Sequence, residues 1–516
     1  MTSLNEETLT QLNADVSLPR YDRRQVTTGI VHIGVGNFHR SHQAMYIDTL
    51  MNNGEAMDWG FCGIGLQPSN TRMRDVLAAQ DGLYALVLRH SDGTWEARVI
   101  GSIVEYLFAP DDQEAAIEKM AAPSTRIVSL TVTEGGYNLG AVTGEFNASD
   151  ETVMADLRPG AVPRTVFGLV TEALARRRAR GIPAFTILSC DNIQGNGHVS
   201  RRVFTAFARL RDPELADWMN RQVRFPNGMV DRITPKTTDE DRAELSRRFG
   251  IDDQWPVLCE PFTQWVLEDD FADGRPPFED AGVRIVPDVE PYELMKLRLL
   301  NASHQALCHP GRLVGYRFVH EVTTDPLFAR FLLDYMTAEA IPTLRPVPGV
   351  DLFGYANQLI ERFSNPEVRD TVARLCANAS DCVPKFLLPV IREQLAVGGP
   401  VTRSAAVVAA WARDAEGTDE NGEPHELDDD LAPRLQAAAR RQREHLTAFL
   451  DDNRTVFGEL AEDPRFTSVY GSILASVLER GVRRTFADLD QFAAPAKPGQ
   501  APPALDALDV LERKSP

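Results

Sequence analysis

The chain has 516 residues, which is enough for two or more domains with sizeable hydrophobic cores. Hydrophobic residues make up 43% and charged residues 25%, as in ordinary globular proteins. The formal net charge of -20 argues against nucleic acid or an anionic membrane surface as a partner, and no apolar run is long enough to span a membrane.

The first 28 residues form a polar lead-in. Residues 1–24 lack the apolar core of a signal peptide, so we expect a cytoplasmic protein. The six cysteines show no paired spacing, which predicts free thiols in a reducing compartment. They are Cys62, Cys190, Cys259, Cys308, Cys376 and Cys382.

Strands and helices alternate in the first part of the chain. Strands are expected at 29–36, 59–66, 83–88, 96–105, 126–132 and 184–189, with helices after 36 through 51 and at 165–180. This alternation predicts a mostly parallel sheet. Beyond about residue 291 helical periods dominate, at 292–308, 326–340, 353–363, 366–378, 386–396, 402–413, 431–451, 454–460 and 466–480. We therefore expect an α/β domain over 1–290 and an all-α domain over 291–516.

A glycine-rich turn follows the first predicted strand. Gly34 and Gly36 end the strand, and Asn37 and Phe38 open the next helix. Glycines at this place let the backbone turn tightly and approach a pyrophosphate at the helix N-terminus. The third glycine of the usual dinucleotide fingerprint is absent, so a plain strand–helix turn is the alternative interpretation.

The end of the second predicted strand bears on the choice of cofactor. In dinucleotide-binding sheets an acid here commonly binds the adenosine ribose and disfavours a 2′-phosphate. This chain has Ser69 and Asn70 there and no acid, followed by Arg72. Asn70 can still hydrogen-bond a ribose hydroxyl, whereas Arg72 can accept a phosphate. The sequence therefore predicts NAD or NADP rather than strict use of NAD.

Two further polar positions lie next to predicted strands. Asp191 and Asn192 follow the strand at 184–189, at a carboxyl strand end where α/β sheets bind ligands. Asn192 can complete an oxyanion site with Asn301, and an Asx turn, which is common, is the alternative. Asp231 lies in residues 225–233, which read as a turn into a short strand, and there it can position Lys296 or a substrate hydroxyl. The alternative is a structural ion pair with Arg232 or another neighbour.

The most informative helix is predicted at 292–308 and carries Lys296, Asn301 and His304 among apolar residues. In a regular α-helix Asn301 lies about 140° and His304 about 80° around the axis from Lys296, so the three side chains can share one cleft. A lysine among leucines is desolvated, which lowers its pKa toward that of a general base. Asn301 can donate to an oxyanion, and His304 can hold a hydroxyl. A surface helix with three ordinary polar residues is the alternative.

No residue pattern indicates a metal site. His39 and His42 form the nearest pair of candidate ligands, but no cysteine cluster accompanies them, and Cys62 and Glu260 are remote in sequence. We therefore expect the protein to work without a metal ion.

Together these segments resemble the mannitol dehydrogenase family of long-chain, metal-independent polyol dehydrogenases. The resemblance covers about residues 29–490. Its carriers are residues 33–43, 131–137, 225–238, 260–269, 316–321, 325–328 and the helix around Lys296. Residues 316–321 and 325–328 resemble the members that act on mannitol at C2 more than they resemble the related fructuronate reductases.

The resemblance implies a Rossmann-type domain joined to an α-helical domain, and oxidation of a polyol such as D-mannitol to D-fructose with NAD or NADP. It implies that Lys296 is the catalytic base, that Asn192 and Asn301 stabilise the oxyanion, and that His304 orients the substrate. It also implies that Asp231 and Arg374 belong to the substrate site. Small-molecule substrates are thus the expected partners, and several family members are monomers.

One departure concerns the substrate, because members of the family commonly carry a lysine where this chain has Cys382. Lys385 lies nearby but need not replace it. Other polyols such as arabinitol and sorbitol therefore stay open, as does reduction of a hexuronate, which should need extra cations in the pocket. A non-catalytic dinucleotide sensor is a third hypothesis, although such a protein has little reason to keep Lys296, Asn301 and His304 together.

Overall fold

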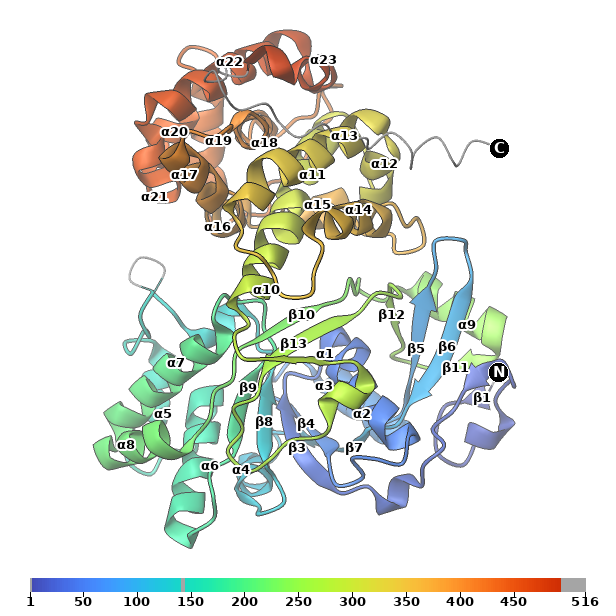
Figure 1. Ribbon diagram of the computed structural model, residues 1–516. Helices are drawn as coiled ribbons and strands as arrows, with labels where there is room; N and C mark the ends of the chain where they lie inside the picture. The colour runs from blue at the N-terminus through green and yellow to red at the C-terminus, as the bar shows by residue number, and fades with distance from the viewer. Residues whose placement is uncertain (1, 141–143, 493–516) are drawn as a thin grey trace. The chain divides into compact units, whose positions relative to one another are not determined.

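The computed structural model describes residues 2–140 and 144–492 (Figure 1). The chain divides into two compact units, which we call unit 1 (Met1–Lys296 and Leu344–Asp370) and unit 2 (Leu297–Thr343 and Thr371–Pro516). The first boundary lies inside a run of helical residues, and the segment Leu344–Asp370 belongs to unit 1. The predicted boundary between a dinucleotide-binding domain (1–290) and a substrate domain (291–516) stays a prediction. Residues 493–516 of the second predicted domain lie outside the described residues.

The main sheet of unit 1 has five parallel strands in the order β7-β4-β3-β8-β9. Four of these strands are buried along their whole length, because helices cover both faces of the sheet. This explains why they read as short, nearly continuous apolar runs. The strands are β7 (Ile103–Phe108), β4 (Gly60–Gly65), β3 (Thr28–Ile33), β8 (Ile127–Leu130) and β9 (Thr186–Ser189).

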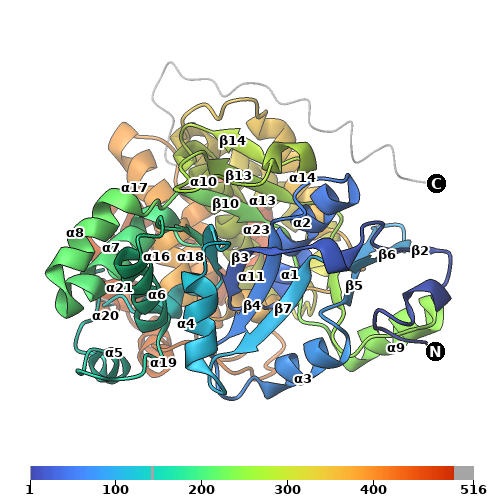
Figure 2. The same cartoon turned by 90° about the horizontal axis from the view of Figure 1, so that it is seen from below.

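Two hydrophobic cores lie on opposite sides of this sheet. One packs Val31, Ile64 and Val128 against α4 (Gln113–Ala121), α6 (Val166–Arg180), α7 (Asn196–Arg211) and α8 (Pro213–Gln222), which gather together in Figure 2. The other packs Ile30, Phe61 and Ile127 against α2 (Gln43–Asn52) and α3 (Thr71–Ala79). Together the two cores hold the carboxyl ends of the strands in place.

Two predicted elements of unit 1 were each wrong in one respect. The strand predicted at 96–105 is two strands, because β6 (Trp95–Ile100) pairs with β5 (Tyr84–Arg89) and β2 (Val16–Ser17), whereas β7 pairs with β4 in the main sheet. The helix predicted from 37 to 51 is also two, α1 (Asn37–Ser41) and α2, because His42 leaves the helical conformation with φ -119° and ψ -90°.

Three smaller sheets complete unit 1. Their strand orders are β12-β5-β6-β2, β10-β13-β14 and β1-β11. The strands are β12 (Val257–Cys259), β5 (Tyr84–Arg89), β2 (Val16–Ser17), β10 (Gly228–Asp231), β13 (Gln264–Glu268), β14 (Arg284–Val286), β1 (Thr2–Ser3) and β11 (Ile251–Asp252). The further helices of unit 1 are α5 (Glu151–Asp156), α9 (Asp239–Phe249), α10 (Glu290–Met295) and α14 (Leu352–Phe363).

The regular elements described in unit 2 are helices, as the sequence predicts. At its centre α11 (Ala302–Leu313) packs on α18 (Thr402–Asp414), which is rich in buried alanine. The other α-helices are α12 (Val319–Thr324), α13 (Pro326–Asp334), α15 (Val372–Cys376), α16 (Ala379–Phe386), α17 (Leu388–Val397), α19 (Ala432–Arg441), α20 (Ala448–Asp452), α21 (Arg454–Phe457), α22 (Pro464–Arg480) and α23 (Val482–Ala487). The predicted fold class, α/β followed by all-α, is thus confirmed.

The helix predicted at 292–308 departs from the regular form. Helix α10 passes into a π-helical turn, Lys296–Asn301, before α11 begins. Helix α11 then continues through Pro310 and Gly311 to Leu313. In a π-turn the hydrogen bonds join residues five apart, so Lys296 and Asn301 stand one turn apart instead of about 140° around an α-helix.

The structure bears on two expectations from the sequence, one about the cysteines and one about membrane-spanning segments. All six cysteines are free, and only Cys382 is partly exposed. Among the described residues no helix is both long and apolar enough to cross a membrane.

Three histidines are buried around the glycine-rich turn. His32 hydrogen-bonds the hydroxyls of Ser129 (2.8 Å) and Thr131 (2.9 Å) and stacks on His39 with 3.5 Å between ring centroids. The Nε2 atom of His42 lies 2.9 Å from the carbonyl oxygen of Gln264. Burial lowers the pKa of both His32 and His42 to about 3, so both are neutral in the folded protein near pH 7.

His42→Gln is expected to remove part of the acid sensitivity of folding. Below about pH 6.5 the unfolded chain binds a proton at His42 that the folded protein does not, so this residue's contribution to stability is lost as the pH falls toward 3. The stability difference between wild type and variant should shrink by about 1.4 kcal/mol per pH unit in this range. Urea unfolding at about pH 7 and about pH 5 measures it, with the exposed His198→Gln as control. An equal pH dependence in His42→Gln and wild type would exclude this effect.

Candidate active site

The glycine-rich turn between β3 and α1 has the properties of a nucleotide-binding turn. Gly34 has φ +95°, and a Cβ there would lie 2.2 Å from the carbonyl oxygen of Thr131. Gly36 differs, because a Cβ there would meet nothing nearer than the carbonyl oxygen of Gly34 at 3.7 Å. The packing of the protein therefore requires glycine at position 34 but not at position 36. An unobstructed glycine at a helix N-terminus is what a closely approaching pyrophosphate needs.

The side chains of the next two residues contact the protein itself. Asn37 accepts a hydrogen bond from Arg40 (2.8 Å) and donates to the carbonyl oxygen of Pro235 (3.3 Å). The ring of Phe38 stacks on His42, with 5.0 Å between centroids.

At the end of β4 the predicted cofactor residues border α3. Ser69 is exposed, and Asn70 is the N-cap residue of α3, although its side chain makes no capping hydrogen bond. The guanidinium of Arg72 lies over the Trp255 ring, 4.4 Å from its centroid. This contact holds the positive charge of Arg72 at the start of α3, next to Ser69 and Asn70, where the usual acid is absent.

Lys296 is buried, with 7% of its surface exposed, and its amine is held by two acceptors. Its Nζ donates to Oδ1 of Asn192 (2.6 Å) and to the carbonyl oxygen of Val230 (2.8 Å). Asn192 follows β9 and Val230 lies in β10, so two sheets of unit 1 position this amine. The structure thus brings together Lys296 and Asn192, two residues that the sequence separates by 104 positions.

The electrostatic surroundings of Lys296 favour its neutral form. Burial lowers its pKa, and the charge of Arg362 adds to this, whereas Asp231 and Glu293 oppose it. A neutral amine has two hydrogens and one lone pair. Because Asn192 and Val230 accept the two hydrogens, the lone pair stays available to take a proton.

Glu293 lies one helical turn before Lys296 and is also buried. Its carboxylate accepts a hydrogen bond from the backbone nitrogen of Gly195 (2.8 Å). Burial raises its pKa to about 7. The carboxyl group therefore changes charge near neutral pH, close to the amine that it influences.

Asp231 is held by an ion pair that joins distant parts of unit 1. Arg362, on α14, donates to both of its carboxylate oxygens (2.8 and 3.0 Å) and also to Glu260 (2.7 and 3.0 Å). The guanidinium lies 3.8 Å from the centroid of the Phe262 ring. Arg232, the ion-pair partner that the sequence suggests, donates to backbone carbonyl oxygens instead. Arg362 is 131 residues from Asp231, so no local signal could have revealed it.

Asp191 has a structural task. It accepts hydrogen bonds from the backbone nitrogens of Val132 (3.1 Å) and Thr133 (2.9 Å) and from the hydroxyl of Tyr137 (2.8 Å). These contacts fix the loop after β8, where Thr133 has φ +65°. Asp191 therefore shapes the loop at the strand ends, while its neighbour Asn192 contacts Lys296.

The remaining predicted substrate residues belong to unit 2. Asn301 and His304 lie at and just after the start of α11, and Arg374 lies on α15 with its side chain exposed. Gln305 of α11 donates to the carbonyl oxygen of Leu375 (3.1 Å), which ties the two helices together. The Oδ1 atom of Asn301 is buried and has no hydrogen-bond partner among the described residues.

The position of the missing lysine lies on α16. Cys382 is half-buried, and the exposed Lys385 forms an ion pair with Asp381 (2.6 Å) one turn away.

The histidines that were considered as metal ligands make other contacts. His39 stacks on His32, and His42 lies beside the Gln264 carbonyl oxygen. In the described part of the chain the group with metal-ligand geometry is a different one, formed by Cys308, His309 and Cys376. The sequence does not reveal this group, because Cys376 is far from the other two residues in the chain.

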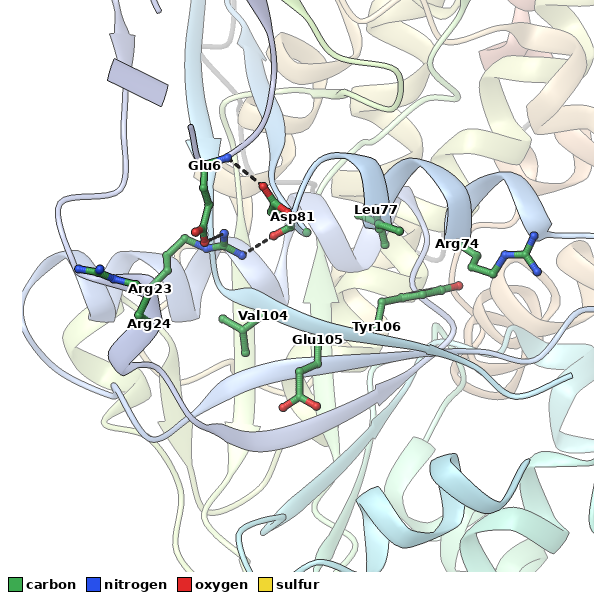
Figure 3. A pocket seen from close by; sticks show the side chains of 11 residues that line it. Glu6, Arg23, Arg24, Arg74, Leu77, Asp81, Val104, Glu105 and Tyr106 are labelled. Atoms are coloured by element: carbon green, nitrogen blue, oxygen red, sulfur yellow. Dashed lines mark hydrogen bonds and ion pairs between the residues drawn. The ribbon is translucent and has the colours of Figure 1, made fainter. Parts of the chain in front are cut away.

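A separate pocket of unit 1 lies among the N-terminal segment, α3 and β7 (Figure 3). Its charged groups are already paired, since Arg23 contacts Glu6 and the Asp81 carbonyl oxygen, and Arg74 contacts Asp111 (2.8 Å). None of the residues predicted for the site lines it. The lining residues are Glu6, Arg23, Arg24, Arg74, Leu77, Ala78, Asp81, Gly82, Val104, Glu105 and Tyr106.

The sequence matches two family profiles in succession. Residues 28–280 match the mannitol dehydrogenase Rossmann domain, and residues 288–477 match the mannitol dehydrogenase C-terminal domain. The chain belongs to the mannitol dehydrogenase family. The resemblance inferred from its motifs is therefore confirmed, together with the Rossmann-type architecture of the N-terminal part.

Relatives of known name agree with this assignment. The mannitol 2-dehydrogenase of Phaeosphaeria nodorum is 48% identical over 488 residues, which cover 94% of this chain and 85% of the relative. The mannitol 2-dehydrogenase of Aspergillus fumigatus is 46% identical over 492 residues, which cover 93% and 98%.

Two solved structures are similar over nearly the whole chain. One is Pseudomonas fluorescens mannitol 2-dehydrogenase in a ternary complex with NAD and D-mannitol, with a TM-score of 0.87, 46% identity and coverage of 95% of this chain and 99% of that one. The other is a substrate-free D-sorbitol dehydrogenase, with a TM-score of 0.84, 39% identity and coverage of 94% and 100%. The family thus includes members named for different polyols.

Proposed function

We propose that this protein is an NAD(P)-dependent polyol dehydrogenase that interconverts a polyol and a ketose by hydride transfer, with D-mannitol and D-fructose as its main pair. The observation that carries the proposal is the buried amine of Lys296, which donates hydrogen bonds to Asn192 and to the carbonyl oxygen of Val230. A base of this kind is what an alcohol dehydrogenase needs when no metal ion acidifies the hydroxyl. Family membership and the names of the relatives support the same activity.

The residues around the glycine-rich turn fit a dinucleotide. The turn at Gly34 and Gly36 would hold the pyrophosphate on backbone nitrogens at the start of α1, beside Asn37 and Phe38. Ser69 and Asn70 would face the adenosine ribose. When bound, the nicotinamide supplies the hydride acceptor for alcohol oxidation and the hydride donor for ketone reduction.

The chain's own residues handle the proton. Lys296 takes the proton of the substrate hydroxyl during oxidation and returns it during reduction. The Oδ1 atom of Asn192 accepts from Lys296, which leaves its amide group to donate to the substrate oxygen. We assign a second donation to Asn301 and the orientation of a substrate hydroxyl to His304, with Asp231 and Arg374 as further substrate-site residues.

The choice between NAD and NADP follows from the end of β4. NAD is the coenzyme in the Pseudomonas fluorescens complex, and we propose that this protein uses it. Asn70 stands where an acid would repel a 2′-phosphate, and Arg72 is anchored nearby on Trp255. Use of NADP as a second coenzyme is therefore part of the proposal.

Other expectations from the sequence are kept as proposals. They are a dinucleotide-binding role for residues 1–290 and a substrate role for 291–516, catalysis without a metal ion, a monomeric state and a cytoplasmic location. The composition favours small molecules over nucleic acid or membranes as partners.

Sorbitol is a second candidate substrate, because a D-sorbitol dehydrogenase shares this architecture at 39% identity. Arabinitol and a hexuronate stay as further alternatives, since Cys382 replaces a common lysine and Lys385 is paired with Asp381. A non-catalytic dinucleotide sensor is disfavoured, because such a protein does not need a desolvated lysine held by two acceptors.

An initial-rate panel in a buffer with a strong chelator tests the proposal. It pairs fructose and a hexuronate with NADH and NADPH, and mannitol, arabinitol and sorbitol with NAD and NADP. We expect rapid, chelator-resistant fructose reduction and mannitol oxidation, with activity from both coenzymes. The ratio of the NADH and NADPH rates measures what Asn70 and Arg72 do. Turnover of arabinitol, sorbitol or a hexuronate without mannitol would overturn the substrate assignment, and no turnover of any pair would favour the sensor.

A further inference from the structure

A cluster of two cysteines and one histidine lies in the core of unit 2. Cys308 and His309 are neighbours on α11, and Cys376 is the last residue of α15. One potential ligand atom from each residue lies within 4.8 Å of the other two. All three side chains are buried. The polyol reaction proposed above, which uses Lys296, gives no reason for this cluster.

The ring of His309 is oriented by a buried carboxylate. Its Nδ1 atom lies 2.8 Å from Oδ2 of Asp414, which is fully buried and is also paired with Arg312 and His425. Because Nδ1 is committed to Asp414, Nε2 is the ring nitrogen left to act as a donor to a cation. Nε2 is buried and has no hydrogen-bond partner among the described residues. A carboxylate behind a ligating imidazole is the usual outer partner in protein metal sites.

We propose that Cys308, Cys376 and His309 form a buried structural site for a soft, thiolate-binding cation, with Cu⁺ as the best match. Two sulfurs and one imidazole nitrogen are ligands that select Cu⁺ or Zn²⁺ over harder ions. Closed zinc sites take four ligands, whereas the described residues supply three here. A three-ligand, thiolate-rich site therefore favours Cu⁺.

A cation bound at this site would link the two helices that carry predicted substrate residues. Its ligands join α11, which begins next to Asn301 and carries His304, to α15, which carries Arg374. Gln305 already ties these helices through the carbonyl oxygen of Leu375. A cation would add a second and stronger link between them, so its first effect should be on stability rather than on proton transfer.

Anaerobic titration of the reduced full-length protein with Cu⁺, in competition with a chromogenic Cu⁺ chelator, tests the site. Wild type is expected to bind one tight equivalent after prolonged incubation. Cys308→Ser and Cys376→Ser should each weaken this binding at least about 100-fold, and Asp414→Asn about 10- to 100-fold. Cys62→Ser is the matched control, because Cys62 is a buried cysteine of unit 1 outside the cluster, and it should bind like wild type.

Several results would overturn the proposal. They are equal Cu⁺ binding by wild type and both cluster variants, tighter binding of Zn²⁺ than of Cu⁺, or a Cys308–Cys376 disulfide in the protein as isolated. If the serine variants do not fold, the site is tested by comparing the melting temperature of wild type with and without Cu⁺. One equivalent of Cu⁺ should raise it, and an unchanged value would reject the site. These readouts do not depend on polyol turnover, so they separate this proposal from the proposed function.

Discussion

Lys296→Ala is expected to abolish both mannitol oxidation and fructose reduction while leaving coenzyme binding nearly intact. The substitution removes the only proton acceptor assigned to the substrate hydroxyl, and losing a general base typically costs about 10²- to 10⁴-fold in rate. The cradle for the dinucleotide at Gly34 and Gly36 is built from other elements and should not change. Initial rates give kcat, and a titration of NADH fluorescence gives the dissociation constant.

Lys119→Ala is the matched control for this experiment. Lys119 lies in the same unit, but it is paired with Glu105 on the surface of α4 and β7, so its removal should leave kcat unchanged. A Lys296→Ala enzyme that binds NADH poorly but turns over normally once saturated would contradict the assigned role. Such a result would make Lys296 a residue that shapes the coenzyme site instead.

The general fold was predictable because its signals are local. Strands β3, β4, β8 and β9 are buried on both faces, so each one reads as a short apolar run between turns. The breaks that were missed depend on single backbone conformations, such as that of His42 between α1 and α2. The return of Leu344–Asp370 to unit 1 depends on long-range packing, which periodicity alone does not record.

The candidate site was predictable only where its residues stand in a recognisable local context. Lys296 and Asn192 were each identified from their own surroundings, and the structure joins them by a 2.6 Å hydrogen bond. The π-helical turn after Met295 could not be read from the sequence, because leucine-rich segments suit an α-helix equally well. Arg362 was missed for another reason, since only the folded chain brings it to Asp231.

Arg362→Met is expected to produce the largest loss of stability. The guanidinium contacts Asp231 and Glu260 through four hydrogen bonds, and all three side chains are buried. Removing the cation takes the positive partner from two buried carboxylates, and breaking a buried ion pair in this way typically costs about 3–5 kcal/mol. Denaturant unfolding measures the loss as a lower midpoint. Arg369→Met is the control, because its ion pair with Glu240 is exposed and should contribute at most about 1 kcal/mol.

The same substitution should also change the chemistry of the site. Burial and the charge of Arg362 lower the pKa of Lys296, whereas Asp231 raises it, so loss of Arg362 leaves burial alone to oppose Asp231 and the pKa should rise. Lys296 then needs a higher pH to become neutral, and the pH profile of mannitol oxidation should shift to higher pH.

Adding Asp231→Asn and Glu260→Gln to Arg362→Met removes the two carboxylate charges that have lost their partner, and it should restore part of the stability. If Arg362→Met unfolds at the same denaturant concentration as Arg369→Met, the buried network does not hold the site together. A shift in the profile without a loss of stability would limit Arg362 to tuning Lys296, since the two readouts report different consequences of one buried charge.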